Sequence, residues 1–167
     1  MKIKSSLLLF AAALWAAGSA VAKDPVRVPA PEGVLPVVIT ESVGTMGNAF
    51  TDYDRLDLAL QQVAKERNWP VKISVQKFAS NTPDYLTELN ITLQRVRQEI
   101  PGEYLYRGWT MLWVDGKKHD LKIVEFRYTY RIGEQTDRSM EKLFRGAALA
   151  TADKIEPLLF PDLNKKK

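Results

Sequence analysis

The sequence has no cysteine and a single histidine, His119, in 167 residues. Without thiols it can form no disulfide framework, no cysteine nucleophile and no thiolate metal site. One histidine cannot build a multi-histidine metal centre, so we expect His119 to lie in a solvated turn. No Gly-x-Ser-x-Gly elbow and no lysine-bearing phosphate loop is present. The sequence therefore predicts no metal site and no cofactor.

The chain also has little net charge once its two ends are set aside. Lysine and arginine number 24 against 20 acidic residues. Lys2 and Lys4 stand at the start and residues 165–167 at the end, and without these five lysines the balance is 19 against 20. A nucleic-acid-binding domain concentrates basic residues on one face of its body. We therefore expect no nucleic-acid partner.

Long hydrophobic runs are missing too, apart from a short one near the start. Residues 7–17 are apolar, follow the basic residues 1–4 and precede Ala20-Val21-Ala22. This is the pattern of an export signal cleaved after Ala22, and the run is too short for a stable membrane anchor, which needs about 20 residues. An uncleaved anchor is the alternative. With no cysteine to acylate, we expect a periplasmic or secreted protein and not a lipoprotein.

The remainder has the size and composition of one domain. It is 46% hydrophobic and 26% charged overall, which is too apolar for a disordered chain. We predict a signal peptide over 1–22, an extended leader over 23–33, a single α/β domain over 34–160 and a frayed basic tail over 161–167.

Hydrophobic periodicity predicts two helices and five strands. Apolar residues recur at helical spacing over about 51–68, where Leu56, Leu60 and Val63 belong to one stripe, and over about 136–156. We expect Pro70 and Pro157 to end these helices. Alternating or β-branched runs predict the strands, at residues 34–40, 71–76, 88–94, 104–114 and 121–132. The order βαββββα favours an α+β fold, a two-layer sandwich with both helices on one face of a mostly antiparallel sheet.

The last two strands allow two registers. A two-residue turn at Asp115-Gly116 pairs Val114 with Lys117, whereas a six-residue loop pairs Val114 with Leu121. The longer loop sets Trp109 opposite Phe126, and we prefer it because apolar cross-strand pairs stabilise a sheet. Both registers predict the same helix-facing residues: Leu105, Trp109, Met111, Trp113, Val124, Phe126, Tyr128 and Tyr130.

The opposite sheet face then carries the candidate binding residues Tyr104, Tyr106, Arg127 and Arg131. Tyrosine and arginine on a rigid sheet suit recognition of a protein, peptide or glycan. An ordinary solvated face with stacked tyrosine and arginine is the other interpretation. The same register places further residues on this face, with the apolar ones toward the hairpin tip: Leu112, Val114, Leu121, Ile123, Glu125 and Thr129.

Catalytic groups are harder to find. The acidic residues Asp52, Asp54 and Asp57 stand where a helix N-terminus favours negative charge. Another acidic pair, Asp84 and Glu88, flanks the start of a strand. No histidine partner is indicated for the serines considered as nucleophiles, which are Ser42, Ser80 and Ser139. We therefore predict no catalytic residue.

An architectural resemblance follows from these elements. An exported chain with Leu35-Pro36-Val37-Val38 in its first strand, a helix, meandering strands and an alanine-rich last helix resembles the small α/β module of bacterial envelope proteins. Examples are the N-terminal domain of the Tol-Pal translocation protein TolB and the outer-membrane activators of penicillin-binding proteins. The likeness covers about residues 34–160. It implies an envelope module and transfers no residue role, since fold does not define function.

The sequence thus favours an exported, non-enzymatic binding or envelope-assembly module that uses an exposed sheet face. Its expected partner is an envelope protein or a glycan, with no integral membrane segment after signal cleavage. The alternatives are a small secreted enzyme with an unrecognised pocket and a structural homodimer.

Overall fold

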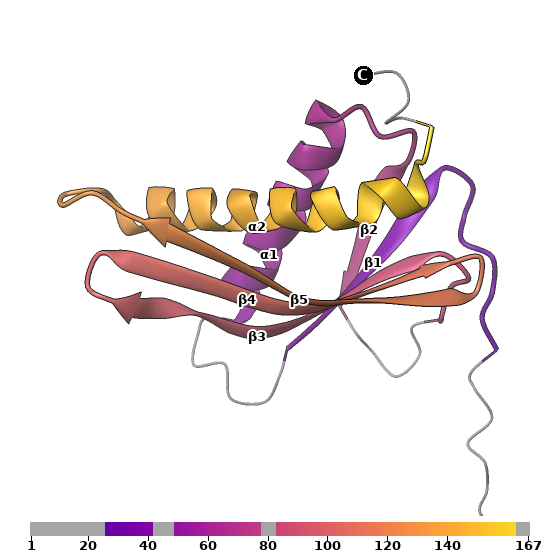
Figure 1. The fold of residues 1–167 in the computed structure, drawn as a ribbon, viewed down its shortest axis with the longest axis horizontal. Coiled ribbons are helices and arrows are strands. Elements are labelled where there is room, and N and C mark those ends of the chain that lie inside the picture. Colours follow the sequence, from indigo (N-terminus) through magenta and orange to yellow (C-terminus); the bar gives the residue numbers. More distant parts are fainter. Residues whose placement is uncertain (1–25, 42–48, 78–82, 163–167) are drawn as a thin grey trace, which may run out of the picture.

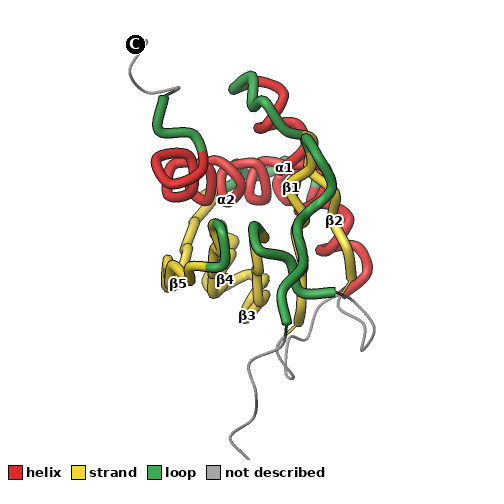
Figure 2. Tube along the Cα trace, turned by 90° about the vertical axis from the view of Figure 1, so that its right-hand side faces the viewer, coloured by secondary structure: helices red, strands yellow, loops and turns green. Residues whose placement is uncertain are grey.

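The computed structural model describes residues 26–41, 49–77 and 83–162. These residues form one sheet with two helices packed on the same side of it (Figures 1 and 2). The predicted α+β sandwich and the order βαββββα are confirmed. In chain order the elements are β1 (Val34–Glu41), α1 (Ala49–Glu66), β2 (Lys72–Lys77), β3 (Glu88–Ile100), β4 (Glu103–Val114), β5 (Lys117–Thr129) and α2 (Thr136–Leu159).

The five strands form a mixed sheet in the order β2-β1-β3-β4-β5. β1 is parallel to both of its neighbours, β2 and β3. The crossover through α1 accounts for the parallel order of β1 and β2. β3, β4 and β5 are antiparallel and are the longest strands. The short turns between these three strands account for their antiparallel order.

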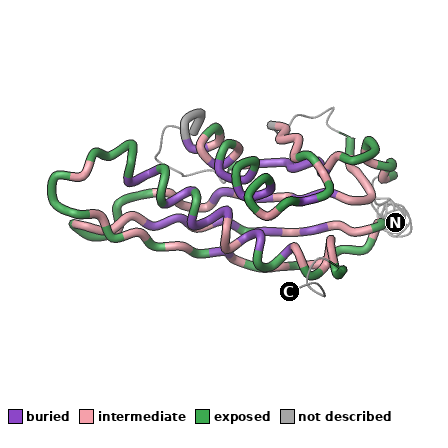
Figure 3. The backbone as a smooth tube through the Cα atoms, turned by 90° about the horizontal axis from the view of Figure 1, so that it is seen from above, coloured by how far each residue is buried: buried purple, intermediate pink, exposed green. Residues whose placement is uncertain are grey.

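The core lies between the sheet and the helices. α1 contributes the predicted stripe that includes Leu56, Leu60 and Val63, all fully buried. In β1 the odd-numbered residues face the helices, and the core cluster therefore contains Leu35 and Val37. α2 adds Leu143, Phe144, Ala147, Ala148 and Ile155. Figure 3 shows this buried strip running along the middle of the molecule while the loops at its ends are exposed.

The prediction that Pro157 ends the last helix is wrong. α2 continues to Leu159 with Pro157 in its final turn. A proline at this point removes a single intrahelical hydrogen bond, and the next turn closes where the Phe160 N–H donates to the carbonyl of Glu156 at 2.8 Å. Phe160 then folds back onto Trp69, with ring centroids 5.5 Å apart.

The preferred six-residue loop in the last hairpin is also wrong. Val114 pairs with Lys117 across a two-residue turn. Both turn residues have positive φ, 50° at Asp115 and 78° at Gly116. This is the conformation of a type I′ turn, which Asp-Gly favours because its twist matches that of the strands. The shorter alternative is therefore the one adopted at the turn.

A β-bulge in β5 then changes the pairing by one residue. Thr110 pairs with Lys122 and Met111 with Asp120, so Leu121 has no partner in β4. Lys122 has φ of 60°, and its N–H donates to Oδ1 of Asp120 at 2.9 Å. An extra residue on one strand reverses which side chains share a face beyond it.

The faces predicted for β4 are consequently reversed, while those of the second half of β5 are correct. Tyr106 pairs with Phe126, and Gly108 pairs with Val124, all on the helix side. Leu112 is fully buried, and Val114 and Leu121 pack against the core. The odd-numbered residues of β4 are those that face away from the helices, namely Leu105, Arg107, Trp109, Met111 and Trp113.

Candidate functional site

The four predicted binding residues do not form one surface. Tyr106 is completely buried and packs edge-on against Phe144 of α2, with ring centroids 5.8 Å apart. Tyr104 is half-buried on the helix side of the sheet, and its ring lies 5.0 Å from that of Tyr130. Arg127 remains exposed on the sheet face away from the helices. Arg131 lies in the loop after β5, where its N–H donates to Glu134 at 3.3 Å.

The sheet still has an uncovered face, but different residues of β4 line it. Among the described residues no helix or strand packs over the side of β3–β5 that faces away from α1 and α2 (Figure 2). Trp109 lies on this side and is 40% exposed, although sequence reasoning expected it in the core. We call this surface the open face, and define it by Arg95, Arg97, Glu99, Glu103, Arg107, Trp109, Ile123, Glu125 and Arg127.

The N-terminal segment bounds the open face at one end. Arg27 stacks on the ring of Trp113, 3.4 Å from the ring centroid, and reaches Glu88 at 3.8 Å. Glu88 itself is buried and accepts hydrogen bonds from the Tyr85 N–H and from Asn90. Arg27 also lies 4.0 Å from the Asp84 carboxylate, so the predicted acidic pair, Asp84 and Glu88, holds this segment in place through one guanidinium. Trp109 is left as the accessible tryptophan of the described residues.

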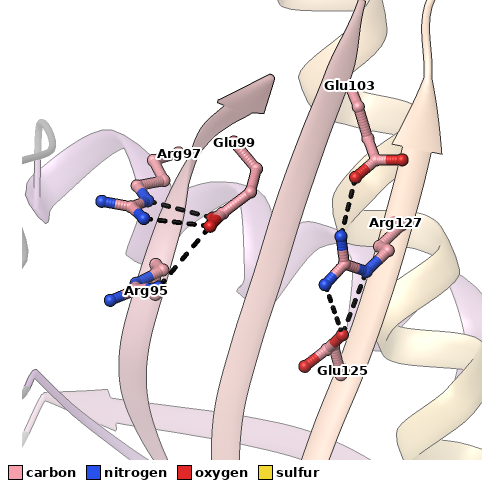
Figure 4. Close-up of polar contacts among 6 residues, drawn as sticks. All are labelled: Arg95, Arg97, Glu99, Glu103, Glu125 and Arg127. Carbon is pink, nitrogen blue, oxygen red and sulfur yellow. Dashed lines mark hydrogen bonds and ion pairs between the residues drawn. The ribbon is translucent and has the colours of Figure 1, made fainter.

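Toward the other end, β3 carries an arginine–glutamate cluster (Figure 4). The Arg97 guanidinium donates twice to Glu99, at 3.0 and 3.1 Å, and Arg95 lies 3.8 Å from the same carboxylate. The hydrogen bonds from Arg97 lower the pKa of Glu99 below its ordinary value, and the positive charges of Arg97, Arg95 and Arg127 act in the same direction. Glu99 thus stays ionised at neutral pH.

A second cluster joins β4 and β5. Arg127 donates to Glu103 at 2.8 Å and also contacts Glu125 at 3.0 Å (Figure 4). These two carboxylates, Glu103 first, raise the pKa of Arg127 further above its ordinary value. Both clusters are held by strands instead of loops, so their guanidinium groups keep a defined spacing across the sheet.

Arg107 lies between these clusters and has no ion pair with any described residue. It pairs across the sheet with Arg95 on one side and Glu125 on the other, and it precedes Trp109 by two residues on the same face. Its Nε is buried and has no hydrogen-bond partner in the described part of the chain. The open face therefore has four arginines against three glutamates, which are Glu99, Glu103 and Glu125, with the unmatched cation beside the exposed indole.

The structure places His119 and Ser139, two further candidates from the sequence, in a strand and in a helix. His119 lies in β5, where it pairs with Leu112 of β4, and not in a turn as expected. Ser139 is buried, and its hydroxyl donates to the carbonyl of Gln135 at 3.3 Å. The predicted export signal, Ser42, Ser80 and the end of the predicted basic tail lie outside the described residues. Within the described ranges, no three histidine or acidic side chains are grouped as a metal site would require.

Asp52 is the one acidic residue of the first helical turn that is buried. It is 8% exposed and lies 3.7 Å from Arg55. Burial raises its pKa to about 6, against the opposing effect of Arg55 and with a smaller contribution from Glu41. Among the described residues, Arg55 and Glu41 are the charged groups that act on this carboxyl, and we assign it no catalytic role.

One signal in the sequence indicates the bulge that exchanges the covered and uncovered faces of β4. In β5 the apolar residues are odd-numbered up to Ile123 and even-numbered from Val124 onward. This change of phase is what a one-residue bulge produces. Together with Asp115-Gly116 it would have placed Trp109 on the open face.

The sequence matches no family model and no curated protein. An uncharacterized protein of known structure aligns at 14% identity over 80% of this chain and 96% of its own, with a TM-score of 0.49. The PelC dodecamer of Paraburkholderia phytofirmans aligns at 11% identity over 77% of this chain and 92% of its own, with a TM-score of 0.43.

A third similar structure is rare lipoprotein B of Shewanella oneidensis, at 14% identity over 79% of this chain and 99% of its own, with a TM-score of 0.32. We transfer no residue role from any of the three. No helix in the described ranges has the length and apolarity needed to cross a bilayer.

Proposed function

We propose that this chain is an exported, non-enzymatic binding protein of the cell envelope that docks a protein partner on its open face. The export signal at residues 1–22, with cleavage after Ala22 and no lipid attachment, supports the location. The observation that carries the proposal is the exposed Trp109 beside the unpaired Arg107 on a sheet face that no described element covers.

The residue types of this face suit a protein interface. Tryptophan and arginine are the side chains most enriched among residues that dominate binding energies. Around Trp109, the half-buried Met111 and Ile123 extend the apolar area, and the two arginine–glutamate clusters form a polar border. The strands preorganise this surface, so little conformational entropy is lost on binding.

The charge of the face specifies the chemistry of the partner. Three arginines of the open face are matched by glutamates, while Arg107 has none. We therefore expect the docking segment of the partner to place a carboxylate near Arg107 and an apolar or aromatic side chain against Trp109. Arginine is well suited to this role because its planar guanidinium binds a carboxylate through two parallel hydrogen bonds.

Site-specific photo-crosslinking in the producing cell tests this surface. A photoreactive phenylalanine analogue at position 109 is expected to yield a discrete adduct that Arg107→Glu abolishes. The matched control is position 58, because Leu58 is 67% exposed on α1, on the other layer. No adduct at position 109, or equal adducts at 109 and 58, would overturn the proposal.

The mass of the adduct decides between this function and the homodimer alternative. An adduct of two copies of this chain would replace the partner proposal with self-association through the open face. Sedimentation velocity of the purified chain at two concentrations would then show a dimer that Trp109→Ser dissociates.

A further inference from the structure

We propose that the end of the molecule formed by residues 100–102 and 130–135, here called the tip, docks on the surface of an anionic phospholipid bilayer. Two isoleucines carry this inference. Ile132 is fully exposed, at 105% of its reference area, and Ile100 is 57% exposed. Apolar side chains this exposed on ordered turns are typical of interaction sites when they lie together.

The backbone brings these two isoleucines to one end of the molecule. Ile100 is the last residue of β3, next to the β3–β4 turn, and Ile132 lies in the loop between β5 and α2. Figure 1 shows this turn and this loop at the same end of the molecule, on the left. The Tyr130 N–H donates to the carbonyl of Gly102 at 2.9 Å, which ties the loop to the turn. The tip is therefore one structural unit that carries two exposed apolar side chains.

Tyrosines lie directly behind the isoleucines. The rings of Tyr104 and Tyr130 are 5.0 Å apart, and the Tyr130 hydroxyl accepts a hydrogen bond from Gln98 at 2.8 Å. An aromatic body with a polar end is favoured at the headgroup level of a bilayer, just outside the hydrocarbon. The order from the end inward is thus isoleucine and then tyrosine.

Unpaired cations complete the arrangement. Arg131 and Arg138 form no ion pair with a described residue, whereas nearby Lys142 pairs with Glu134 at 2.7 Å. With Ile132 and Lys142, both arginines line a hollow of about 620 Å³ beside the tip. Anionic headgroups attract such cations within a Debye length of the surface.

A bilayer fits this tip better than a protein groove does. Ile100 and Ile132 are carried by two separate segments, the end of β3 and the β5–α2 loop, and Arg131 and Arg138 share a hollow with Ile132. This arrangement suits shallow insertion of each isoleucine among headgroups. The tip and the open face are carried by different observations, so this inference does not rest on the proposed function.

Vesicle sedimentation tests the inference. The chain is purified after export, because an apolar leader would itself bind lipid. The vesicles contain phosphatidylglycerol and phosphatidylcholine in roughly equal amounts, or phosphatidylcholine alone. We expect binding to the anionic vesicles, weakened about tenfold by Ile132→Ser and by Ile100→Ser. Arg131→Gln/Arg138→Gln should weaken binding to anionic vesicles and leave the phosphatidylcholine result unchanged. Leu58→Ser is the matched control and should bind as the original chain does.

A spectroscopic readout is available because the chain has no cysteine. An environment-sensitive dye on Ile132→Cys should shift to the blue with anionic vesicles, and the same dye on Leu58→Cys should not. Failure of the original chain to bind anionic vesicles would overturn the inference. Binding that the tip variants leave unchanged, or a dye shift at position 58 alone, would do the same.

Discussion

The side chain of Tyr106 lies across Gly108 beneath α2. A Cβ at Gly108 would come within 2.7 Å of the Tyr106 hydroxyl, so this close approach requires glycine. The hydroxyl is buried and has no partner among the described residues, and burial raises the pKa of Tyr106 above its ordinary value. Tyr106 therefore acts as a core aromatic that carries an unsatisfied polar atom.

Two substitutions separate a core role from a surface role for Tyr106. Tyr106→Phe removes the unsatisfied hydroxyl and should leave the free energy of unfolding unchanged or raise it by up to about 1 kcal/mol. Tyr106→Ala should lower it by about 3–5 kcal/mol, since it opens a cavity beside Phe144. Urea denaturation measures both. A loss below about 1 kcal/mol for Tyr106→Ala would contradict the observed register.

Asp52 predicts a dependence of stability on pH. Its pKa is about 6 in the folded chain against an ordinary value of 3.8, so the folded state binds the proton more tightly. The contribution of this group to stability therefore falls as pH rises from about 4 through 6. Asp52→Asn should stabilise the chain by on the order of 1 kcal/mol at pH 7, and the difference should vanish below pH 4.

Thermal denaturation between pH 4 and 8 checks this prediction. Asp54→Asn is the control, because Asp54 is exposed on the same helix and should change stability by less than about 0.5 kcal/mol at any pH. A destabilised Asp52→Asn chain at pH 7 would show that its carboxylate is favourably solvated or paired.

At the scale of elements, β5 is an edge strand, and a side chain of α2 binds two of its backbone carbonyl oxygens. Lys154 donates to the carbonyl oxygens of Leu121 at 3.0 Å and Ile123 at 3.2 Å. These oxygens lie at the bulge, where the ladder to β4 is interrupted. Bulges and lysines at sheet edges hinder pairing with a second sheet. The same feature that sets the faces of β4 also protects the edge.

Lys154→Met keeps the aliphatic stem and removes both hydrogen bonds. We expect the free energy of unfolding to fall by about 1 kcal/mol, because two carbonyls lose a charged donor at a partly exposed site. Amide hydrogen exchange should accelerate around the bulge and remain unchanged in α1. Arg145→Met serves as the comparison, since it breaks only the exposed pair with Glu66 and should cost less than about 0.5 kcal/mol. Equal losses for the two variants would show that the bulge does not need Lys154.

For the whole molecule, the layer arrangement leaves two surfaces without internal partners. The helices cover one side of the sheet, which exposes the other, and the antiparallel hairpin extends to the tip (Figure 1). The open face is centred on Trp109, whereas the tip ends in Ile100 and Ile132. A protein partner and a bilayer could thus be engaged by one chain.

These two surfaces should act independently. Trp109→Ser/Arg107→Glu is expected to abolish the crosslinked adduct and to leave vesicle sedimentation unchanged. Ile100→Ser/Ile132→Ser should weaken vesicle sedimentation and leave the crosslinked adduct unchanged. The physical reason is that Arg107 and Trp109 lie in the middle of β4, whereas Ile100 ends β3 and Ile132 follows β5. Loss of both activities in either variant would indicate a single shared surface or an unfolded chain, which circular dichroism distinguishes.

The sequence by itself determined the number, order and type of the elements. Helical periodicity in α1 and α2 and the alternating or β-branched runs are local signals, and these signals suffice to predict the elements and the two-layer arrangement. They also placed Leu56, Leu60 and Val63 in the core correctly.

Only the tertiary structure decided which face of β4 is covered. Both faces of β4 are apolar or aromatic in sequence, so alternation within the strand carries no preference. Its orientation follows from pairing with β5, where the bulge at Leu121–Lys122 and the cover of α2 over Tyr106 act together. A one-residue offset between two strands is a long-range property, and it moved the binding surface from Tyr106 to Trp109.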